Sequence, residues 1–183
     1  MQWTPRLAVA SDIPALDRLI AESSRRLLLG VYSAGQIEGA LGPVFGVDEQ
    51  MIADGTCFVV DYGDELIACG GWSFREAAFG GRAAGEVAPA RSNPAVDVAR
   101  IRAFFVNPGH ARKGIGTAIL HACEHALVAA GFRRVEIAAT LAGEALYRHY
   151  GYETDRYEEL PLTNCPPLRI ARMSKRFQGD YNS

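Results

Sequence analysis

The sequence predicts a mixed α/β fold built on one sheet, and three observations indicate it. Segments rich in β-branched and aromatic residues alternate with segments whose apolar residues recur at helical spacing. Glycine and proline separate most of these segments, as expected where a chain turns between elements. The 183 residues, 49% of them hydrophobic, suffice for one core of ordinary size. We therefore expect a single domain over residues 1–183, with strands in one sheet flanked by helices.

The start of the chain is expected to form a short strand and two helices. Residues 6–9 have a β-like composition, and residues 11–14 (SDIP) combine capping side chains with an early proline, which is typical of a helix start. Apolar residues at helical spacing continue this helix until Gly30, which is suited to end it. Ser33 is placed to cap a second, short helix that ends at Gly42.

A hairpin and a long loop are expected next. Strand-like residues 56–61 and 66–74 flank a short connection that contains a Gly-Asp pair, and this pattern favours a tight turn. Residues 75–94 are rich in Gly, Ala, Arg and Pro and show no sustained period. We therefore expect a long loop there, of the kind that often has a functional role in compact domains.

The second half of the chain has a more regular pattern of strands and short helices. Its first strand is apolar with interleaved arginines, and the sequence Asn-Pro-Gly ends it. The expected elements are strands over 98–106, 134–139, 152–160 and 168–175, and helices over 114–130 and 143–150. The complete order is β-α-α-β-β-β-α-β-α-β-β, which again indicates a mixed α/β sheet.

Charge and composition exclude several classes of protein. The chain has 19 Lys and Arg against 21 Asp and Glu, so its formal net charge of -2 gives no general attraction to nucleic acid or to an anionic membrane. No apolar run approaches the roughly 20 residues that span a bilayer, and the first residues are too polar for a signal peptide. The four cysteines are far apart and form no Cys-x-x-Cys pair. Isolated, reduced thiols of this kind suit the cytoplasm, so we expect a cytoplasmic protein. Its oligomeric state is left open, and a homodimer is one possible form.

The clearest chemical signal lies in residues 104–117 (FFVNPGHARKGIGT). A buried strand ends in a turn, and a basic loop with spaced glycines leads directly into a helix. The free amides and the positive dipole of a helix N-terminus favour a phosphate group, and glycines let the ligand approach the main chain. These features favour a phosphate-binding loop over the simpler alternative, a strand-to-helix turn that needs two glycines for close packing.

Two familiar nucleotide motifs do not fit this segment. The ATP-type loop requires a lysine where Ile115 stands, although Gly109 and Gly114 have the spacing of its glycines. The dinucleotide fingerprint requires glycine or alanine where Ile119 stands. The phosphate ligand must therefore be of another kind.

The segment resembles the GNAT superfamily of acetyl-CoA-dependent N-acetyltransferases. The core motif of that family is a strand, a proline-containing turn and then Gln/Arg-x-x-Gly-x-Gly/Ala at the start of a helix, and residues 111–116 (ARKGIG) match it except for Ala111. The resemblance implies that the loop amides bind the coenzyme A pyrophosphate and that the pantetheine arm lies beside the preceding strand. The cofactor-binding residues it implies are Phe104, Val106, Arg112, Lys113, Gly114, Ile115, Gly116 and Thr117.

A second motif follows at the distance that the family requires. Residues 145–153 (ALYRHYGYE) resemble the closing motif, in which a tyrosine four residues before a glycine lies near the acetyl-CoA sulfur. The resemblance assigns this place to Tyr147, as the general acid that protonates the departing thiolate. The alternative is an aromatic residue packed under the sheet, which suits Tyr150 and Tyr152. Thr140 stands where many relatives have an asparagine, and the two motifs together cover residues 98–153.

The resemblance also implies an architecture and a reaction. The expected fold is a mixed, mostly antiparallel sheet of six to seven strands, splayed between the strand ending at Val106 and the strand ending near Ala139. Acetyl-CoA would enter that gap, and its acetyl group would move directly to a primary amine of a small molecule or peptide. The competing hypothesis is a non-catalytic acyl-CoA-binding or regulatory module of the same fold.

The acceptor side is less defined by the sequence. We nominate no general base, so a water relay is the default for removing the amine proton. Arg100 and Arg102 share one face of their strand, so they either favour an acceptor with a carboxylate or, as we prefer, are solvated or pair with Asp97 or Glu136. The acceptor site is expected from the first two helices and the loop over 75–94. Its candidate residues are Arg26, Tyr32 and Arg102.

Two further patterns are interpreted as structural. Residues 121–125 (HACEH) match the His-x-x-Glu-His pattern of some zinc peptidases, but the apolar stripe at Ile115, Ile119, Ala122 and Ala126 leaves both histidines on a wet helix face. We expect no metal. The basic residues near the C-terminus alternate with apolar ones and predict a final strand with a polar face rather than a nucleic-acid surface.

Overall fold

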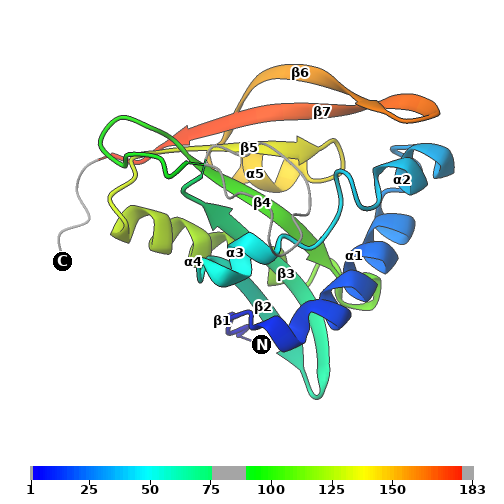
Figure 1. Cartoon of the computed structure of the whole chain (residues 1–183), viewed down its shortest axis with the longest axis horizontal. Helices are drawn as coiled ribbons and strands as arrows, with labels where there is room; N and C mark the ends of the chain where they lie inside the picture. The colour runs from blue at the N-terminus through cyan, green and yellow to red at the C-terminus, as the bar shows by residue number, and fades with distance from the viewer. Residues whose placement is uncertain (1, 76–89, 179–183) are drawn as a thin grey trace.

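A seven-stranded sheet organises the computed structural model, which describes residues 2–75 and 90–178 (Figure 1). The strands lie in the order β1-β2-β3-β4-β5-β7-β6, and every neighbouring pair except β4–β5 is antiparallel. The strands are β1 Arg6–Leu7, β2 Cys57–Tyr62, β3 Glu65–Ser73, β4 Ala99–Val106, β5 Arg134–Thr140, β6 Glu153–Leu162 and β7 Cys165–Arg176. The helices are α1 Ile13–Leu27, α2 Ala34–Ala40, α3 Glu49–Ala53, α4 Ile115–Ala129 and α5 Glu144–His149, with 3-10 turns at Ala10–Asp12 and Pro108–His110. This confirms the predicted fold class.

The helices cover the two faces of the sheet and create two separate apolar cores. One core joins α4 and α5 to the sheet through residues such as Ile119 and Phe132. The other joins α1, α2 and α3 to the opposite face through residues such as Leu16, Ile37 and Met51. Both faces of the central strands are therefore buried, which explains why β3 has an almost continuous run of buried residues instead of an alternating pattern.

Local signals explain where the first helices begin and end. The Ser33 hydroxyl accepts a hydrogen bond from the Gln36 amide, and the Gln36 side chain accepts one from the Ser33 amide, which forms a capping box at the start of α2. Gly30 follows α1 with a φ of +91°, a left-handed conformation that favours glycine and stops the helix. Both predicted helices are confirmed.

Helix α3 was missing from the sequence prediction. It has only five residues, and Met51 is its one fully buried side chain, so it leaves no apolar periodicity to detect. Its only local signal is the cap, because the Asp48 carboxylate accepts hydrogen bonds from the amides of Gln50 and Met51 at 3.1 and 3.3 Å.

The buried stripe of α4 also differs from the prediction. The buried residues are Ile115, Ile119, Leu120, Cys123 and Leu127, whereas Ala122 and Ala126 are only half-buried. Strands β2, β3 and β4 all pack against this helix, so its buried sector is wider than the sequence stripe indicated. His121 and His125 are exposed, as predicted.

The sheet opens in the middle, between the two parallel strands. Paired residues of β4 and β5 run only from Ala99 opposite Val135 to Ile101 opposite Ile137, and beyond them the strands separate. The predicted splay is therefore confirmed.

Strand β4 has a bulge just beyond the point where it separates from β5. Ala103 and Phe104 together face the single residue Gly70 of β3, and Ala103 has a φ of +59°. A Cβ atom at Gly70 would lie 2.7 Å from the Phe104 ring and 2.8 Å from Ile119, so only glycine fits opposite the bulge.

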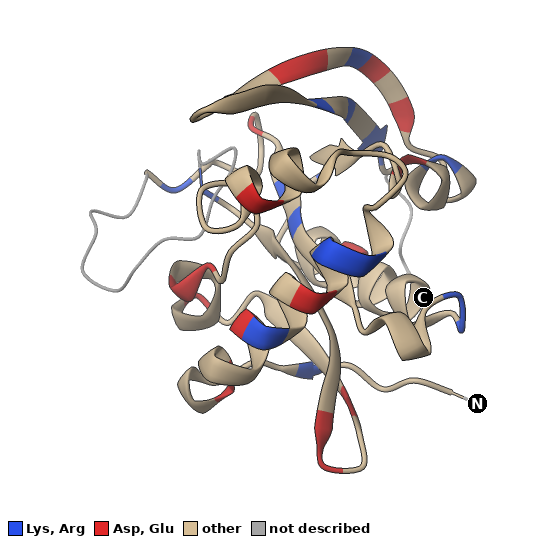
Figure 2. Ribbon diagram, turned by 90° about the vertical axis from the view of Figure 1, so that its right-hand side faces the viewer, with Lys and Arg blue, Asp and Glu red and all other residues tan. Residues whose placement is uncertain are grey.

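The remaining segments agree with the prediction in part. Most of the loop predicted over 75–94 lies outside the described residues, and at its described ends Arg75 and Arg91 form a β-bridge. Strand β7 begins earlier than predicted and includes Pro166 and Pro167, which it tolerates because β5 pairs with β7 only from Ile170 onward. Within the described part of the chain, no helix has the length and hydropathy needed to cross a membrane. Acidic and basic residues occur on the same elements (Figure 2), in keeping with the near-neutral net charge.

Candidate functional site

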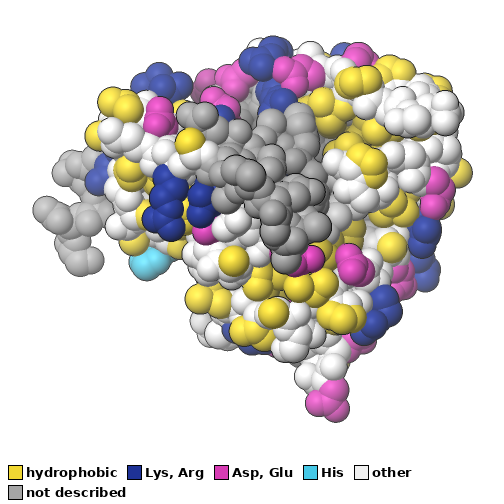
Figure 3. All heavy atoms as spheres, viewed as in Figure 1, with side chains coloured by type: hydrophobic (Ala, Val, Ile, Leu, Met, Phe, Trp, Pro, Cys, Tyr) yellow, Lys and Arg dark blue, Asp and Glu magenta, His cyan; other side chains and the backbone are white. Residues whose placement is uncertain are grey.

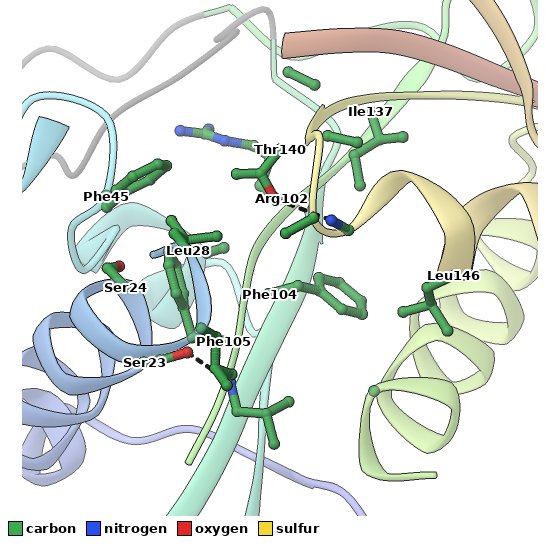
Figure 4. Close-up of a pocket in the computed structure, with 18 of the residues that line it drawn as sticks. Ser23, Ser24, Leu28, Phe45, Arg102, Phe104, Phe105, Ile137, Thr140 and Leu146 are labelled. Atoms are coloured by element: carbon green, nitrogen blue, oxygen red, sulfur yellow. Dashed lines mark hydrogen bonds between the residues drawn. The ribbon is translucent and has the colours of Figure 1, made fainter. Parts of the chain in front are cut away.

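A cavity of about 460 Å³ occupies the gap between β4 and β5 (Figure 4). Its size is in the range of small-molecule sites. It is lined by α1, the α2–α3 connection, β4, the start of α4, the end of β5 and α5. Figure 3 shows hydrophobic side chains, in yellow, among charged and polar ones on the face it views. Leu27 and Leu29, at and just beyond the end of α1, are exposed, and Leu27 also lines the cavity.

One end of the cavity is formed by the loop between β4 and α4. The Asn107 side chain accepts a hydrogen bond from the Gly109 amide at 2.8 Å and fixes the turn after β4. Arg112 and Gly114 then adopt φ values of +63° and +81°, which redirect the backbone before α4 begins. The Ala118 amide donates to the Gly114 carbonyl at 3.1 Å, so the amides of residues 115–117 precede the hydrogen-bonded ladder of the helix. Such a helix start is suited to bind an anion.

The side chains of this loop have different roles from one another. Arg112 and Gly116 line the cavity, whereas Ile115 is buried in the core below α4. The Lys113 ammonium donates to the Gly109 carbonyl at 2.9 Å, and the Thr117 hydroxyl accepts a hydrogen bond from Tyr150 at 3.2 Å. These two side chains therefore stabilise the loop itself, and what they offer a ligand is their backbone.

The N-terminal segment also stabilises this loop. The Trp3 indole nitrogen donates to the Lys113 carbonyl at 2.8 Å, and the Trp3 ring packs edge-on against Tyr62. This contact joins residues that are 110 positions apart, so no local sequence pattern could have indicated it.

The wall of the cavity along β4 contains both strand residues expected to contact the cofactor. Phe104 and Val106 line the cavity, and the Val106 amide donates to the Ser23 hydroxyl at 3.3 Å. Ser23 belongs to α1 and was not among the sequence candidates. A polar side chain on the sheet-facing side of α1 was the signal that could have identified it, since apolar residues precede it there at helical spacing.

Tyr147 projects from α5 into the wall of the cavity. Its side chain is buried and packs edge-to-face against Phe104 on one side and Tyr152 on the other. Burial raises the pKa of the Tyr147 hydroxyl well above its usual value, so this group keeps its proton at neutral pH. Gly143 makes room for the ring, because a Cβ atom there would lie 3.4 Å from Tyr147.

The neighbouring tyrosines have the packing roles that the sequence suggested as an alternative. The Tyr152 hydroxyl donates to the Glu124 carboxylate at 3.0 Å, and Lys175 donates to the same oxygen at 2.8 Å. Burial and Glu124 both raise the pKa of Tyr152. Glu124 is thus occupied by structural contacts, and among residues 2–75 and 90–178 no group of three or more His, Cys, Asp or Glu could hold a metal ion.

Arg102 lines the cavity and forms a buried ion pair with Asp48. The Arg102 Nη2 atom lies 3.0 Å from Asp48 Oδ2, and the two side chains are 8% and 4% exposed. The preferred expectation, that Arg102 is solvated or pairs with Asp97 or Glu136, was therefore wrong. The partner comes from the cap of α3, an element that the sequence did not reveal.

The other acceptor candidates lie outside the cavity wall. Arg26 is on the outer side of α1, 68% exposed and 3.9 Å from Glu22. Tyr32 is buried, where its hydroxyl donates to the Arg169 carbonyl at 2.6 Å and accepts from the Leu141 amide at 2.9 Å. Tyr32 thus ties the α1–α2 connection to β7 and to the end of β5, while α1 contributes other residues to the cavity: Ser23, Ser24, Leu27 and Leu28.

The comparisons with known proteins agree with this geometry. A family model described as acetyltransferase (GNAT) family matches residues 34–152, more than half of the chain. A search of curated proteins returns no match.

Several solved structures share the fold at low sequence identity. A GCN5-related N-acetyltransferase from Rhodopseudomonas palustris is 16% identical, with 97% of each chain covered and a TM-score of 0.71. The PaiA N-acetyltransferase from Thermoplasma acidophilum, solved with coenzyme A, is 15% identical, with 97% of this chain and 100% of that chain covered and a TM-score of 0.63. The ribosomal-protein-S18-alanine N-acetyltransferase from Escherichia coli is 15% identical, with coverages of 100% and 99% and a TM-score of 0.61. At these identities the likeness shows the fold.

Proposed function

The chain belongs to the GNAT family of acetyltransferases, and we propose that it transfers the acetyl group of acetyl-CoA directly to a primary amine of a small molecule or peptide. One observation carries this proposal. The cavity between the separating parallel strands β4 and β5 has two features. At one end lies a loop in which Arg112 and Gly114 have left-handed φ values and which leads into the free amides of α4, and the buried Tyr147 lies on its wall. The first feature suits a pyrophosphate, and the second suits a proton donor.

The residues around the cavity fit acetyl-CoA. The amides of residues 115–117 would hold the pyrophosphate, with the Arg112 side chain beside them. Gly116, at the start of α4, lines the cavity close to Leu146 of α5. The wall between Phe104 and Val106 on one side and Ala139 on the other is largely apolar and suits the pantetheine arm. When bound, acetyl-CoA supplies the activated thioester carbonyl that an amine can attack.

Tyr147 would act as the general acid. The acceptor nitrogen forms the new C–N bond as the C–S bond breaks, and the Tyr147 hydroxyl gives its proton to the departing sulfur. The raised pKa of Tyr147 keeps this proton in place at neutral pH. The amine gives up its own proton to water, and water returns a proton to Tyr147, so the reaction is balanced without a metal.

Three of the four cysteines are buried and unsuited to form an acetyl-enzyme, and the fourth, Cys165, does not line the cavity. Burial raises the pKa of the Cys57 thiol to about 12 and raises those of Cys69 and Cys123 well above their usual value. A buried thiol that stays protonated is a poor nucleophile. This favours direct transfer.

The test combines a binding measurement with a turnover measurement. Acetyl-CoA should raise the melting temperature of the protein, whereas ATP and NAD should not, because a ligand at 100 times its Kd adds about 2.7 kcal/mol of apparent stability. A panel of amines and peptides should then yield acetylated products by mass spectrometry, together with free coenzyme A. Binding of acetyl-CoA with no turnover of any amine would instead support the non-catalytic acyl-CoA-binding module.

Three other expectations remain predictions. The near-neutral charge argues against nucleic acid as a partner, and the scattered cysteines favour a cytoplasmic location. A homodimer would be recognised by the mass of the protein in solution.

A further inference from the structure

We propose that the half of the cavity between α1, the α2–α3 connection and β4 binds the acceptor, and that it selects a small amine that carries a carboxylate. Arg102 is the anchor for that carboxylate, and Ser24 is a second polar contact. This inference rests on the proposed function and names the substrate class for the same site.

The first observation is the orientation of the Arg102–Asp48 pair. One Asp48 oxygen accepts hydrogen bonds from the Gln50 and Met51 amides, and the other lies 3.0 Å from Arg102. Both oxygens of Asp48 are therefore engaged, which leaves it unsuited to bind an ammonium group. Its role is to fix the guanidinium in the cavity wall, so Asp48 is a positioning residue and Arg102 presents the charge.

The chemistry of a fixed guanidinium determines what it recognises. Its planar fork of N–H donors matches the two oxygens of a carboxylate, and holding the fork rigid reduces the entropy lost on binding. A buried ion pair contributes little to stability compared with apolar residues of the same size. A pair of this kind in the wall of an otherwise apolar cavity is therefore better explained by recognition than by folding.

The second observation is independent of the first. Ser24 lies on α1, lines the cavity and is fully buried, and its hydroxyl has no hydrogen-bond partner among the described residues (Figure 4). A buried hydroxyl without a partner is unfavourable, since it has left water without compensation. A polar group of a ligand in the cavity would satisfy it.

The surrounding walls set the remaining character of the acceptor. Leu28, Phe45 and Ile170 line the same half of the cavity, and all three are buried. Phe104 follows Arg102 by two residues on β4, and its ring contacts Tyr147. An acceptor anchored at Arg102 would therefore direct its amine along β4 toward Tyr147 while an apolar substituent contacts Leu28 and Phe45. Apolar amino acids have this combination of groups.

Matched pairs of acceptors test the proposal. Leucine and phenylalanine are compared with leucinamide and phenylalaninamide, which keep the amine and the side chain but lack the carboxylate. We expect kcat/KM to favour the free acids by about 100-fold or more, because the amides lack the carboxylate that the Arg102 guanidinium would bind. Equal rates for acids and amides would overturn the proposal.

The variants separate recognition from folding. Arg102→Gln alone would leave Asp48 buried without its counter-charge, so the informative variant is Arg102→Gln combined with Asp48→Asn, which removes both charges and keeps both side chains polar. We expect this double variant to lose the preference for acids, to within about threefold, while it retains the thermal shift with acetyl-CoA. Arg156→Gln, which removes an exposed arginine of β6, is the matched control and should keep the preference. A double variant that still prefers acids would overturn the proposal.

Ser24→Ala gives a second, independent readout. Because the hydroxyl has no hydrogen-bond partner among residues 2–75 and 90–178, its removal should not lower the melting temperature, but it should raise KM for the acid with kcat little changed. A lower melting temperature with unchanged KM would assign Ser24 a structural role and would contradict the proposal that its hydroxyl contacts the acceptor.

The failure of this inference can be distinguished from failure of the proposed function. If no amine turns over, the melting temperature is measured with coenzyme A present and with each acid or amide added. Stabilisation by acids but not by amides would support the carboxylate site without catalysis. Equal effects of acids and amides, or none, would overturn it even if acetyl-CoA binds as proposed.

Discussion

One half of the cavity is formed mainly by backbone groups, and the other mainly by side chains. The half beside α4 consists mainly of backbone: two left-handed residues, a fixed turn and the amides of a helix start, all within residues 107–117. The acceptor half consists of side chains that come from α1, the α2–α3 connection and β4, which are far apart in the sequence. A contiguous segment leaves a motif, whereas a site assembled from distant side chains does not. The predictions below test this contrast in order of expected effect.

The largest effect should come from Tyr147→Phe. We expect kcat to fall by about 10²- to 10⁴-fold, because the proton donor is lost, while the thermal shift with acetyl-CoA is nearly unchanged. Tyr152→Phe is the control, since this neighbouring tyrosine donates to Glu124 and does not line the cavity. Steady-state kinetics of both variants decide the matter, and comparable losses in the two would argue that the tyrosines act only through packing.

Gly70→Ala should disturb both halves at once. The added Cβ atom would meet Phe104 and Ile119 at 2.7–2.8 Å, so the β4 bulge must shift. Overpacking of this kind costs about 1–3 kcal/mol of unfolding free energy, which urea denaturation would measure. Acetyl-CoA affinity should fall as well, because Phe104 lines the cavity. Unchanged stability would mean that the bulge can move freely and is not held by its glycine.

Asp54→Asn tests how the side-chain half is held in place. Asp54 ends α3, the helix that Asp48 caps, and its carboxylate lies 2.6 Å from Arg75, with both side chains largely buried. The hydrogen bond from Arg75 lowers the pKa of Asp54, so the pair stabilises the fold at pH values above the ordinary pKa of the carboxyl group. That stability is lost as the pH falls through the lowered pKa.

We therefore expect Asp54→Asn to cost about 1.5–3 kcal/mol at pH 7, and much less near pH 2, in unfolding measurements. Glu38→Gln is the control, because Arg25 also lowers the pKa of Glu38 but the pair is fully exposed, so it should change stability little at either pH. An Asp54 effect that does not depend on pH would show that charge is not its cause.

Gly114→Ala and Gly35→Ala form a matched pair for the backbone half. An added Cβ atom meets nothing within 4 Å at either position, but only Gly114 has a left-handed φ. Gly114→Ala should cost about 1–2 kcal/mol and weaken acetyl-CoA binding. Gly35→Ala, inside α2, should stabilise by about 0.5–1 kcal/mol with no effect on binding. Titration of acetyl-CoA by calorimetry checks the difference. Equal affinities in the two variants would show that the left-handed conformation of Gly114 is not required for acetyl-CoA binding.

The sequence predicted much of the fold because its elements carry strong local signals. The capping box at Ser33, the left-handed Gly30 and the apolar runs of the central strands could all be identified from neighbouring residues. Helix α3 could not, since five residues with one buried side chain make no periodic pattern. The loop over 107–117 was identified for the same reason as the helices, because its function depends on local backbone geometry.

The acceptor side shows where local signals end. The sequence placed Arg26 and Tyr32 there, but a helix has several faces, and only packing against the sheet decides which residues of α1 reach the cavity. The partner of Arg102 is 54 positions away in sequence, on an unpredicted cap, so the arginine was assigned to the wrong neighbours.

By itself, the sequence determined most strands and helices of a mixed α/β fold and the segment whose amides are suited to a phosphate group, because each leaves a pattern within a few neighbouring residues. The splay of the sheet was implied by the resemblance to the family. Only the tertiary structure decided that Asp48 holds Arg102, that the Ser24 hydroxyl has no hydrogen-bond partner in the described part of the chain, and that Arg102 and Ser24 border the same cavity as Tyr147. Those relations depend on how α1, α3 and β4 pack together. Packing brings side chains into contact without regard to their distance along the chain.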